Sequence, residues 1–195
     1  MSRAKGPAGA RTWVLAALAS GLCACVSAGD RAGPITYLDP DTGTTFVAVA
    51  RPLVFSHARS ELAARSRDYA SVAAASVDRS GRVEYVLLVY FWSTVDPRIA
   101  PVKPGPTTGL VLAAEDRRIA LEPISLAVPP IDRPPARHII AMMYRTDFAT
   151  LRYLAAVRRI SLLRADTQGT ERYRLWDDER TALADLVRSP TGPLP

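Results

Sequence analysis

The sequence has very little cysteine and very little histidine. Of its 195 residues two are cysteines, Cys23 and Cys25, and two are histidines. Any domain that follows Cys25 therefore has no disulfide, no thiol nucleophile and no thiolate metal ligand. Two histidines without cysteine also leave a typical zinc site short of ligands. We expect no cofactor and no catalytic metal, and we find no assembled catalytic set.

The sequence also lacks an apolar run long enough to span a bilayer as a stable helix. Residues 12–22 are apolar but short, and Arg3, Lys5 and Arg11 lie before or at the start of this run without any acidic residue. A basic head followed by a short apolar core is the layout of a secretory signal peptide.

An excess of positive charge does not point to nucleic acid here. The net charge of +6 comes from 25 basic and 19 acidic side chains. Removal of the three basic residues of the signal peptide leaves 22 basic against 19 acidic side chains, a net charge of +3. So small an excess does not support a basic nucleic-acid-binding surface.

The signal peptide ends in Leu22-Cys23-Ala24-Cys25, which resembles the lipobox of bacterial lipoproteins. The resemblance implies that signal peptidase II cuts before Cys25, whose sulfur is then diacylated and whose amine is acylated. Two or more acyl chains anchor a protein stably to a membrane. Cleavage after Ala28, which would release a soluble protein, and an uncleaved signal anchor stay open as alternatives.

This interpretation divides the chain into four parts: a signal peptide over 1–24, a lipidated tether over 25–35, one β-rich domain over 36–188 and a disordered tail over 189–195. Val26 follows the lipidated cysteine instead of an acidic residue. In the enterobacterial sorting rule this residue directs export to the outer membrane, with the domain facing the periplasm.

Alternating apolar residues and turn signals predict a mainly β, α+β domain: an antiparallel β-sandwich-like sheet with two or three short helices. In the segment 83–92 both faces are apolar, so we expect this strand to be central and covered on both sides. Helices are expected over 147–157 and 178–188, and a short one over 60–67. The expected strands are 44–51, 53–57, 69–77, 82–92, 110–114, 119–122, 138–144, 160–164 and 170–176.

Catalytic motifs are weak throughout the domain. Asp39, Asp41 and Gly43 form part of an aspartic-protease-like or calcium-loop-like pattern, but ordinary turn chemistry accounts for it. Two proline-rich segments, 96–109 and 129–137, are long enough to form functional rims. A hydrolase would use Asp39, Asp41 or His138 at such a rim.

The last expected strand carries the clearest candidate ligand surface. Arg172, Arg174 and Trp176 alternate along it and therefore share one face. A stripe of this composition is able to bind sugars, phosphates or anionic lipid headgroups through charge and stacking. The alternative is a solvated face whose arginines pair with nearby Asp and Glu residues. The stretch 90–92, Tyr-Phe-Trp, is either core or a second ligand platform.

Three stretches, 36–45, 67–69 and 89–94, resemble a group of small uncharacterised lipoproteins of Gram-negative bacteria. The resemblance implies a location in the cell envelope and no particular activity. We therefore expect a non-enzymatic, lipid-anchored envelope protein that binds a protein, peptidoglycan or lipid partner. A periplasmic hydrolase and an accessory subunit of an envelope complex are the alternatives.

The lipid anchor is tested by replacing Cys25 with serine. Cys25→Ser removes the sulfur that carries the diacylglycerol, so the protein should move from the detergent phase to the aqueous phase in detergent partitioning. Cys23→Ser is the matched control and should leave partitioning unchanged. Retention of the Cys25→Ser protein in the membrane would show that the anchor lies elsewhere.

Overall fold

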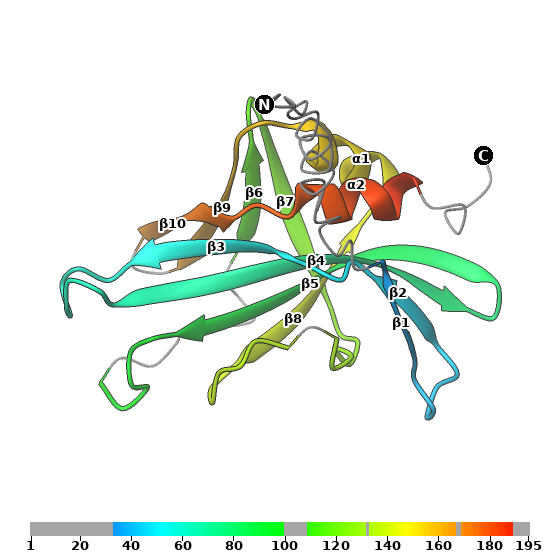
Figure 1. The fold of residues 1–195 in the computed structure, drawn as a ribbon, viewed down its shortest axis with the longest axis horizontal. Helices are drawn as coiled ribbons and strands as arrows, with labels where there is room; N and C mark the ends of the chain where they lie inside the picture. The colour runs from blue at the N-terminus through cyan, green and yellow to red at the C-terminus, as the bar shows by residue number, and fades with distance from the viewer. Residues whose placement is uncertain (1–32, 100–108, 132, 167–168, 189–195) are drawn as a thin grey trace, which may run out of the picture. The chain divides into compact units, whose positions relative to one another are not determined.

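The structure is a computed structural model and describes residues 33–99, 109–131, 133–166 and 169–188. These residues form ten strands and two helices (Figure 1). In chain order they are β1 (Ile35–Leu38), β2 (Thr45–Ala48), β3 (Leu53–Ala58), β4 (Arg67–Arg79), β5 (Arg82–Ser93), β6 (Leu110–Ala114), β7 (Arg117–Ile124), β8 (Ile140–Thr146), α1 (Phe148–Ala156), β9 (Ile160–Asp166), β10 (Gly169–Asp177) and α2 (Arg180–Arg188).

Eight of the strands close into an antiparallel barrel. Their order is β4, β3, β10, β9, β6, β7, β8 and β5, and β5 pairs again with β4. The hairpin of β1 and β2 lies outside this ring, and β2 pairs with residues 75–78 in the second half of β4. The predicted mainly β fold with antiparallel strands is therefore confirmed, whereas the sandwich-like sheet is replaced by a closed barrel with two helices.

Tight turns set the register of two barrel hairpins. Ser80 and Gly81 both have positive φ, 54° and 86°, which is the backbone of a two-residue turn that matches strand twist. The Gly81 amide donates to the Asp78 carboxylate at 2.8 Å and holds this turn. Glu115, with φ of 51°, takes the same role between β6 and β7.

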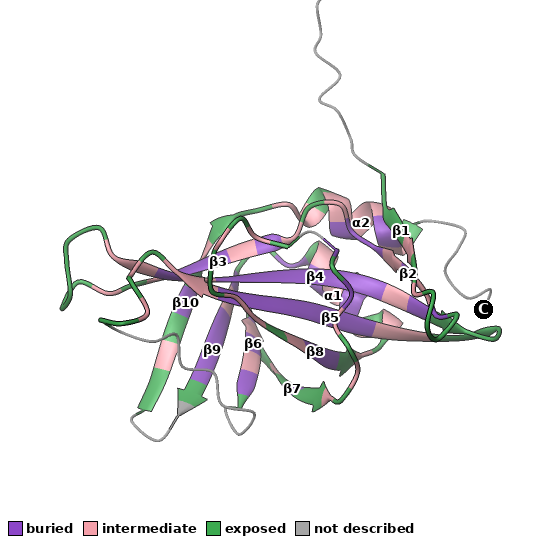
Figure 2. Ribbon diagram, turned by 90° about the horizontal axis from the view of Figure 1, so that it is seen from below, coloured by how far each residue is buried: buried purple, intermediate pink, exposed green. Residues whose placement is uncertain are grey.

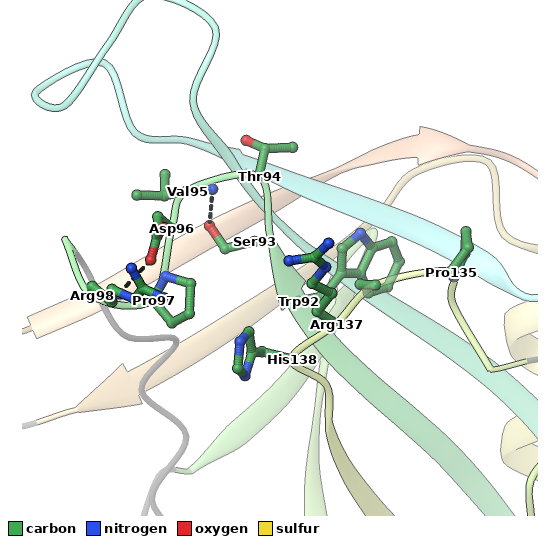
Figure 3. A pocket seen from close by; sticks show the side chains of 11 residues that line it. Trp92, Ser93, Thr94, Val95, Asp96, Pro97, Arg98, Pro135, Arg137 and His138 are labelled. Atoms are coloured by element: carbon green, nitrogen blue, oxygen red, sulfur yellow. Dashed lines mark hydrogen bonds between the residues drawn. The ribbon is translucent and has the colours of Figure 1, made fainter.

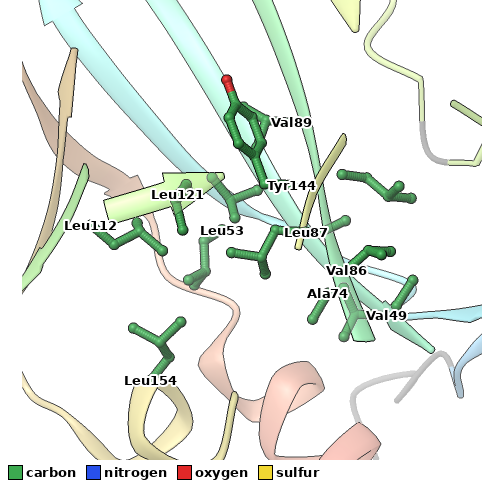
Figure 4. Close-up of a cluster of buried hydrophobic side chains, with 14 of the residues drawn as sticks. Val49, Leu53, Ala74, Val86, Leu87, Val89, Leu112, Leu121, Tyr144 and Leu154 are labelled. Atoms are coloured by element: carbon green, nitrogen blue, oxygen red, sulfur yellow. The ribbon is translucent and has the colours of Figure 1, made fainter. Parts of the chain in front are cut away.

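The barrel interior is apolar at one end, and both helices close that end. Leu154 of α1 faces Leu53, Leu87 and Leu112 of three different strands (Figure 4). Leu183 of α2 lines the same space. Eight strands enclose an interior that side chains can fill, and apolar side chains fill it at this end. The fully buried side chains include Phe46, Phe55, Leu87, Leu88, Phe91, Leu110, Leu112, Met143, Tyr144, Leu151, Leu154 and Tyr173.

The outer face of β4 and β5 is buried as well, along most of their length (Figure 2). The Tyr90 hydroxyl bonds to the carbonyl oxygens of Pro129 and Ile131, at 2.8 and 2.9 Å, and Ile131 is 3% exposed. The segment around residue 130 thus lies over β5. The prediction that the strand at 83–92 is covered on both sides is confirmed.

One local prediction is wrong, and it concerns a short segment. Residues 60–66 form turns instead of the short helix predicted over 60–67, and Arg67 begins β4. Arg59 reaches across these turns to pair with Asp68 at 2.9 Å and holds them in place. Of the predicted tether the structure describes residues 33–35, and β1 begins at Ile35. The helix over 148–156 starts as expected, with the Asp147 carboxylate accepting from the Thr150 amide.

Several predictions fall outside the described residues. They are the signal peptide, Cys25, most of the tether and the tail. Within the residues that the structure describes, no helix is long and apolar enough to cross a membrane.

Leu154→Ala tests the closure of the barrel by α1. The side chain is 1% exposed and its loss leaves a cavity against three strands, so we expect a loss of about 2–5 kcal/mol in the free energy of unfolding, measured in urea. Arg152→Ala, on the exposed side of the same helix, should cost less than about 1 kcal/mol. Equal effects would show that α1 does not pack into the barrel.

Candidate functional site

Three aromatic rings lie side by side on the outer face of the barrel, and we call them the aromatic strip: Trp176 on β10, Tyr69 on β4 and Trp92 on β5. Tyr69 and Trp92 are stacked, with centroids 5.4 Å apart and planes 12° from parallel. Trp176 meets Tyr69 edge to face at 6.2 Å. Trp176 is 59% exposed, which is unusual for so large an apolar side chain in a monomer.

Strand register brings these rings together from distant parts of the chain. Tyr69 pairs directly with Trp92 across β4 and β5. Between β4 and β10 lies β3, where Ser56 pairs with Tyr69 on one side and Arg174 on the other. The short side chain of Ser56 leaves room for Trp176 to reach Tyr69, and a register shift between Leu175 and Asp177 places Trp176 at that point.

A hollow of about 840 Å³ adjoins the Trp92 end of the strip (Figure 3). It lies between the chain that leaves β5 and the chain that enters β8, so residues 96–98 and 135–137 of the two proline-rich segments contribute to its two sides. Arg98 and Pro97 line one side, while Arg137 and His138 line the other. Arg137 and Trp92 both line this hollow (Figure 3).

The electrostatic character of this surface is cationic. The Arg67 guanidinium lies 4.8 Å from the centroid of the Trp176 ring, a favourable cation–π geometry. Within the described residues, neither Arg67 nor Arg98, Arg137, Arg172 or Arg174 forms an ion pair. Asp96, the acidic residue that lines the hollow, accepts a hydrogen bond from the Arg98 amide at 2.8 Å through its carboxylate. These guanidinium groups are therefore open to an anionic ligand.

The predicted ligand residues on β10 lie at the surface. Arg172, Arg174 and Trp176 are exposed on the outer face of this strand. In the stretch 90–92, Tyr90 and Phe91 are core residues, and Trp92 belongs to the aromatic strip. Sequence reasoning missed Arg67 and Tyr69, because only the register of β3 and β4 shows that they adjoin Trp176.

The residues considered for a hydrolase do not converge. Asp39 lies in the turn between β1 and β2, where hydrogen bonds from Thr42 and the Asp41 amide lower the pKa of its carboxyl. That hairpin joins β4 near Asp78, whereas His138 lies in the hollow, near the end of β4 that contains Asp68. These two ends of β4 are about 30 Å apart at about 3.3 Å per residue.

Four charged side chains and one tyrosine lie at the end of the barrel interior opposite the two helices, and we call them the mouth cluster: Arg59, Asp68, Arg164, Glu171 and Tyr173. Arg164 donates to Glu171 at 2.6 Å, and Arg59 donates to Asp68 at 2.9 Å. Burial raises the pKa of the Tyr173 hydroxyl, and the charges of the other four groups also act on it. Sequence reasoning missed this cluster. Its one signal in the sequence is Arg164, a charged residue at the end of the expected strand over 160–164.

No metal centre is present among the described residues, since no three or more His, Cys, Asp or Glu side chains gather there. No protein-family model matches the chain, and searches of the curated proteins and of the solved structures find no significant match.

Asp68→Asn tests the buried ion pair of the mouth cluster. The Asp68 side chain is 4% exposed, so loss of its charge should lower the free energy of unfolding by about 1–3 kcal/mol. Glu61→Gln is the matched control, because Glu61 pairs with the same Arg59 from an exposed position and should cost about 1 kcal/mol or less. Equal losses in urea denaturation would contradict the assigned role of Asp68.

Proposed function

We propose that this protein is a lipid-anchored, non-enzymatic binding module of the bacterial cell envelope whose aromatic strip holds an anionic glycan of the cell wall. The observation that carries the proposal is Trp176, a largely exposed ring that continues into Tyr69 and Trp92 and bears the Arg67 guanidinium on its face. The proposed export and lipid anchor are supported by the signal-peptide layout and by the lipobox-like motif at Cys25.

The shape and chemistry of the strip favour a sugar polymer. Aromatic rings in a row offer flat apolar surfaces on which successive sugar rings can stack, while guanidinium groups pair with carboxylates in a bidentate manner. Here the rings come from β10, β4 and β5, with β3 between the first two, and the row ends at a hollow lined by Arg98 and Arg137. Peptidoglycan combines sugar rings with carboxylates and is the periplasmic polymer with this composition.

A hydrolytic function receives no support from the described residues, because Asp39 lies near one end of β4 and His138 lies near the other. A specific observation does favour the accessory-subunit alternative. β1 pairs only with β2 in the described part of the chain, and Leu38 on it is 60% exposed. This free edge could add a strand from a partner protein, and it does not overlap with the aromatic strip.

The glycan proposal is tested by sedimentation of the purified protein with peptidoglycan sacculi. Trp176→Ala removes the exposed ring and should weaken binding about tenfold, the effect typical of a tryptophan at the centre of an interface. Arg67→Gln should weaken binding to a lesser degree and reduce its dependence on salt.

Two substitutions elsewhere are matched controls. Leu38→Ala removes a side chain as exposed as Trp176, and Arg117→Gln removes a guanidinium that stacks on Tyr153 at 4.4 Å. Both should bind sacculi as the unchanged protein does. If Trp176→Ala also binds normally, the strip is not the site. If binding is seen only with vesicles of anionic lipid, and Trp176→Ala loses it, the ligand is a lipid headgroup and the glycan proposal is wrong.

A further inference from the structure

The mouth cluster contains buried polar atoms without partners. The Arg164 side chain is 5% exposed and its Nη2 donates to Glu171, but its Nε and Nη1 find no hydrogen-bond acceptor among the described residues. The Asp68 side chain is 4% exposed and its Oδ2 accepts from Arg59, but its Oδ1 finds no donor in the same part of the chain. Native proteins satisfy nearly all such atoms, with water or with a ligand.

The unpartnered atoms are of opposite kinds. Arg164 offers free N–H donors on a cation, and Asp68 offers a free oxygen acceptor on an anion. Both face the barrel interior, because Arg164 pairs with Glu171 and Leu110 in the sheet and Asp68 pairs with His57 on the same face. A molecule that satisfies both must accept hydrogen bonds at one end and donate them at the other.

The charge of the cluster further narrows the ligand. Its two guanidinium groups face the two carboxylates of Asp68 and Glu171, and Arg59 also pairs with Glu61, whose side chain is 59% exposed to solvent. The buried charges of the cluster thus offset one another, so a ligand with net charge would leave a buried charge without compensation. A zwitterion brings no net charge. Access does not require the helices to move, because they close the other end of the barrel, and Glu171 and Arg59 are partly exposed at this end.

We propose that the mouth cluster is a second binding site, for a small zwitterion of the α-amino acid class. The ligand carboxylate accepts from the free N–H groups of Arg164, and its ammonium group donates to Oδ1 of Asp68. This site is separate from the aromatic strip, because its side chains lie inside the barrel and those of the strip lie outside.

Calorimetric titration of the full-length protein with glycine, acetate and methylammonium tests the proposal. Glycine should bind saturably, and acetate and methylammonium, which each carry half of the recognised pair, should bind at least about tenfold more weakly. Absence of saturable glycine binding would show that only water fills the cluster. Equal affinities for glycine and acetate would overturn the zwitterion assignment.

Three variants locate the site. Arg164→Lys should abolish glycine binding, and Asp68→Asn should remove the preference for glycine over acetate. Glu171→Gln keeps the side-chain volume, removes a competing carboxylate from Arg164 and should raise acetate affinity about tenfold. Because Glu171 is 28% exposed, this variant still tests the site if the other two fail to fold. Unchanged acetate affinity in Glu171→Gln would contradict the site.

Arg172→Lys and Trp176→Ala are the controls, since both residues lie on the outer face of β10, the strand that also carries Glu171. Neither should change glycine binding. Equal loss of glycine binding in Arg172→Lys and Arg164→Lys would place the ligand on the surface and overturn the proposal. The Trp176→Ala control also separates the two sites, because loss of glycan binding there leaves glycine binding intact.

Discussion

The pairing of β4 with β5 is the interaction on which the rest of the structure depends. It extends without a break from Asp68 and Ser93 to Arg79 and Arg82. Because β4 also pairs with β3 and β5 also pairs with β8, this ribbon closes the ring of eight strands. The same pairing sets Tyr69 against Trp92 on the outside and directs Asp68 inward, so both candidate sites take their geometry from it.

Local signals in the sequence were sufficient for most strands and both helices. Asp78 and Gly81 marked a turn, and the two apolar faces of 83–92 marked a central strand. Closure of the barrel was not predictable in this way, because β3 meets β10 and β6 meets β9 only through contacts between distant segments. Alanine favours helices, and for this reason the sequence predicts a helix where residues 60–66 form turns, although the segment has no apolar stripe to pack.

The residues of the candidate site also fall into two groups: those that local signals predict, and those that only contacts between distant segments bring together. Alternation along one strand was enough to group Arg172, Arg174 and Trp176, since neighbours on one strand are a local property. Their partners Arg67 and Tyr69 belong to another strand, and only cross-strand register brings them near. The mouth cluster was beyond sequence reasoning for a further reason. Which face of an apolar strand points inward depends on the direction in which the sheet curls.

The attachment of β1 has a mechanical consequence. In the described part of the chain β1 is hydrogen-bonded to β2 alone, through four residue pairs, and β2 in turn adjoins the far half of β4. A pull on the chain ahead of Ile35 is therefore carried first by those few hydrogen bonds. The hairpin can peel away and lengthen the extended chain before any strain reaches the closed ring, so the barrel and the two candidate sites on it would stay intact under load.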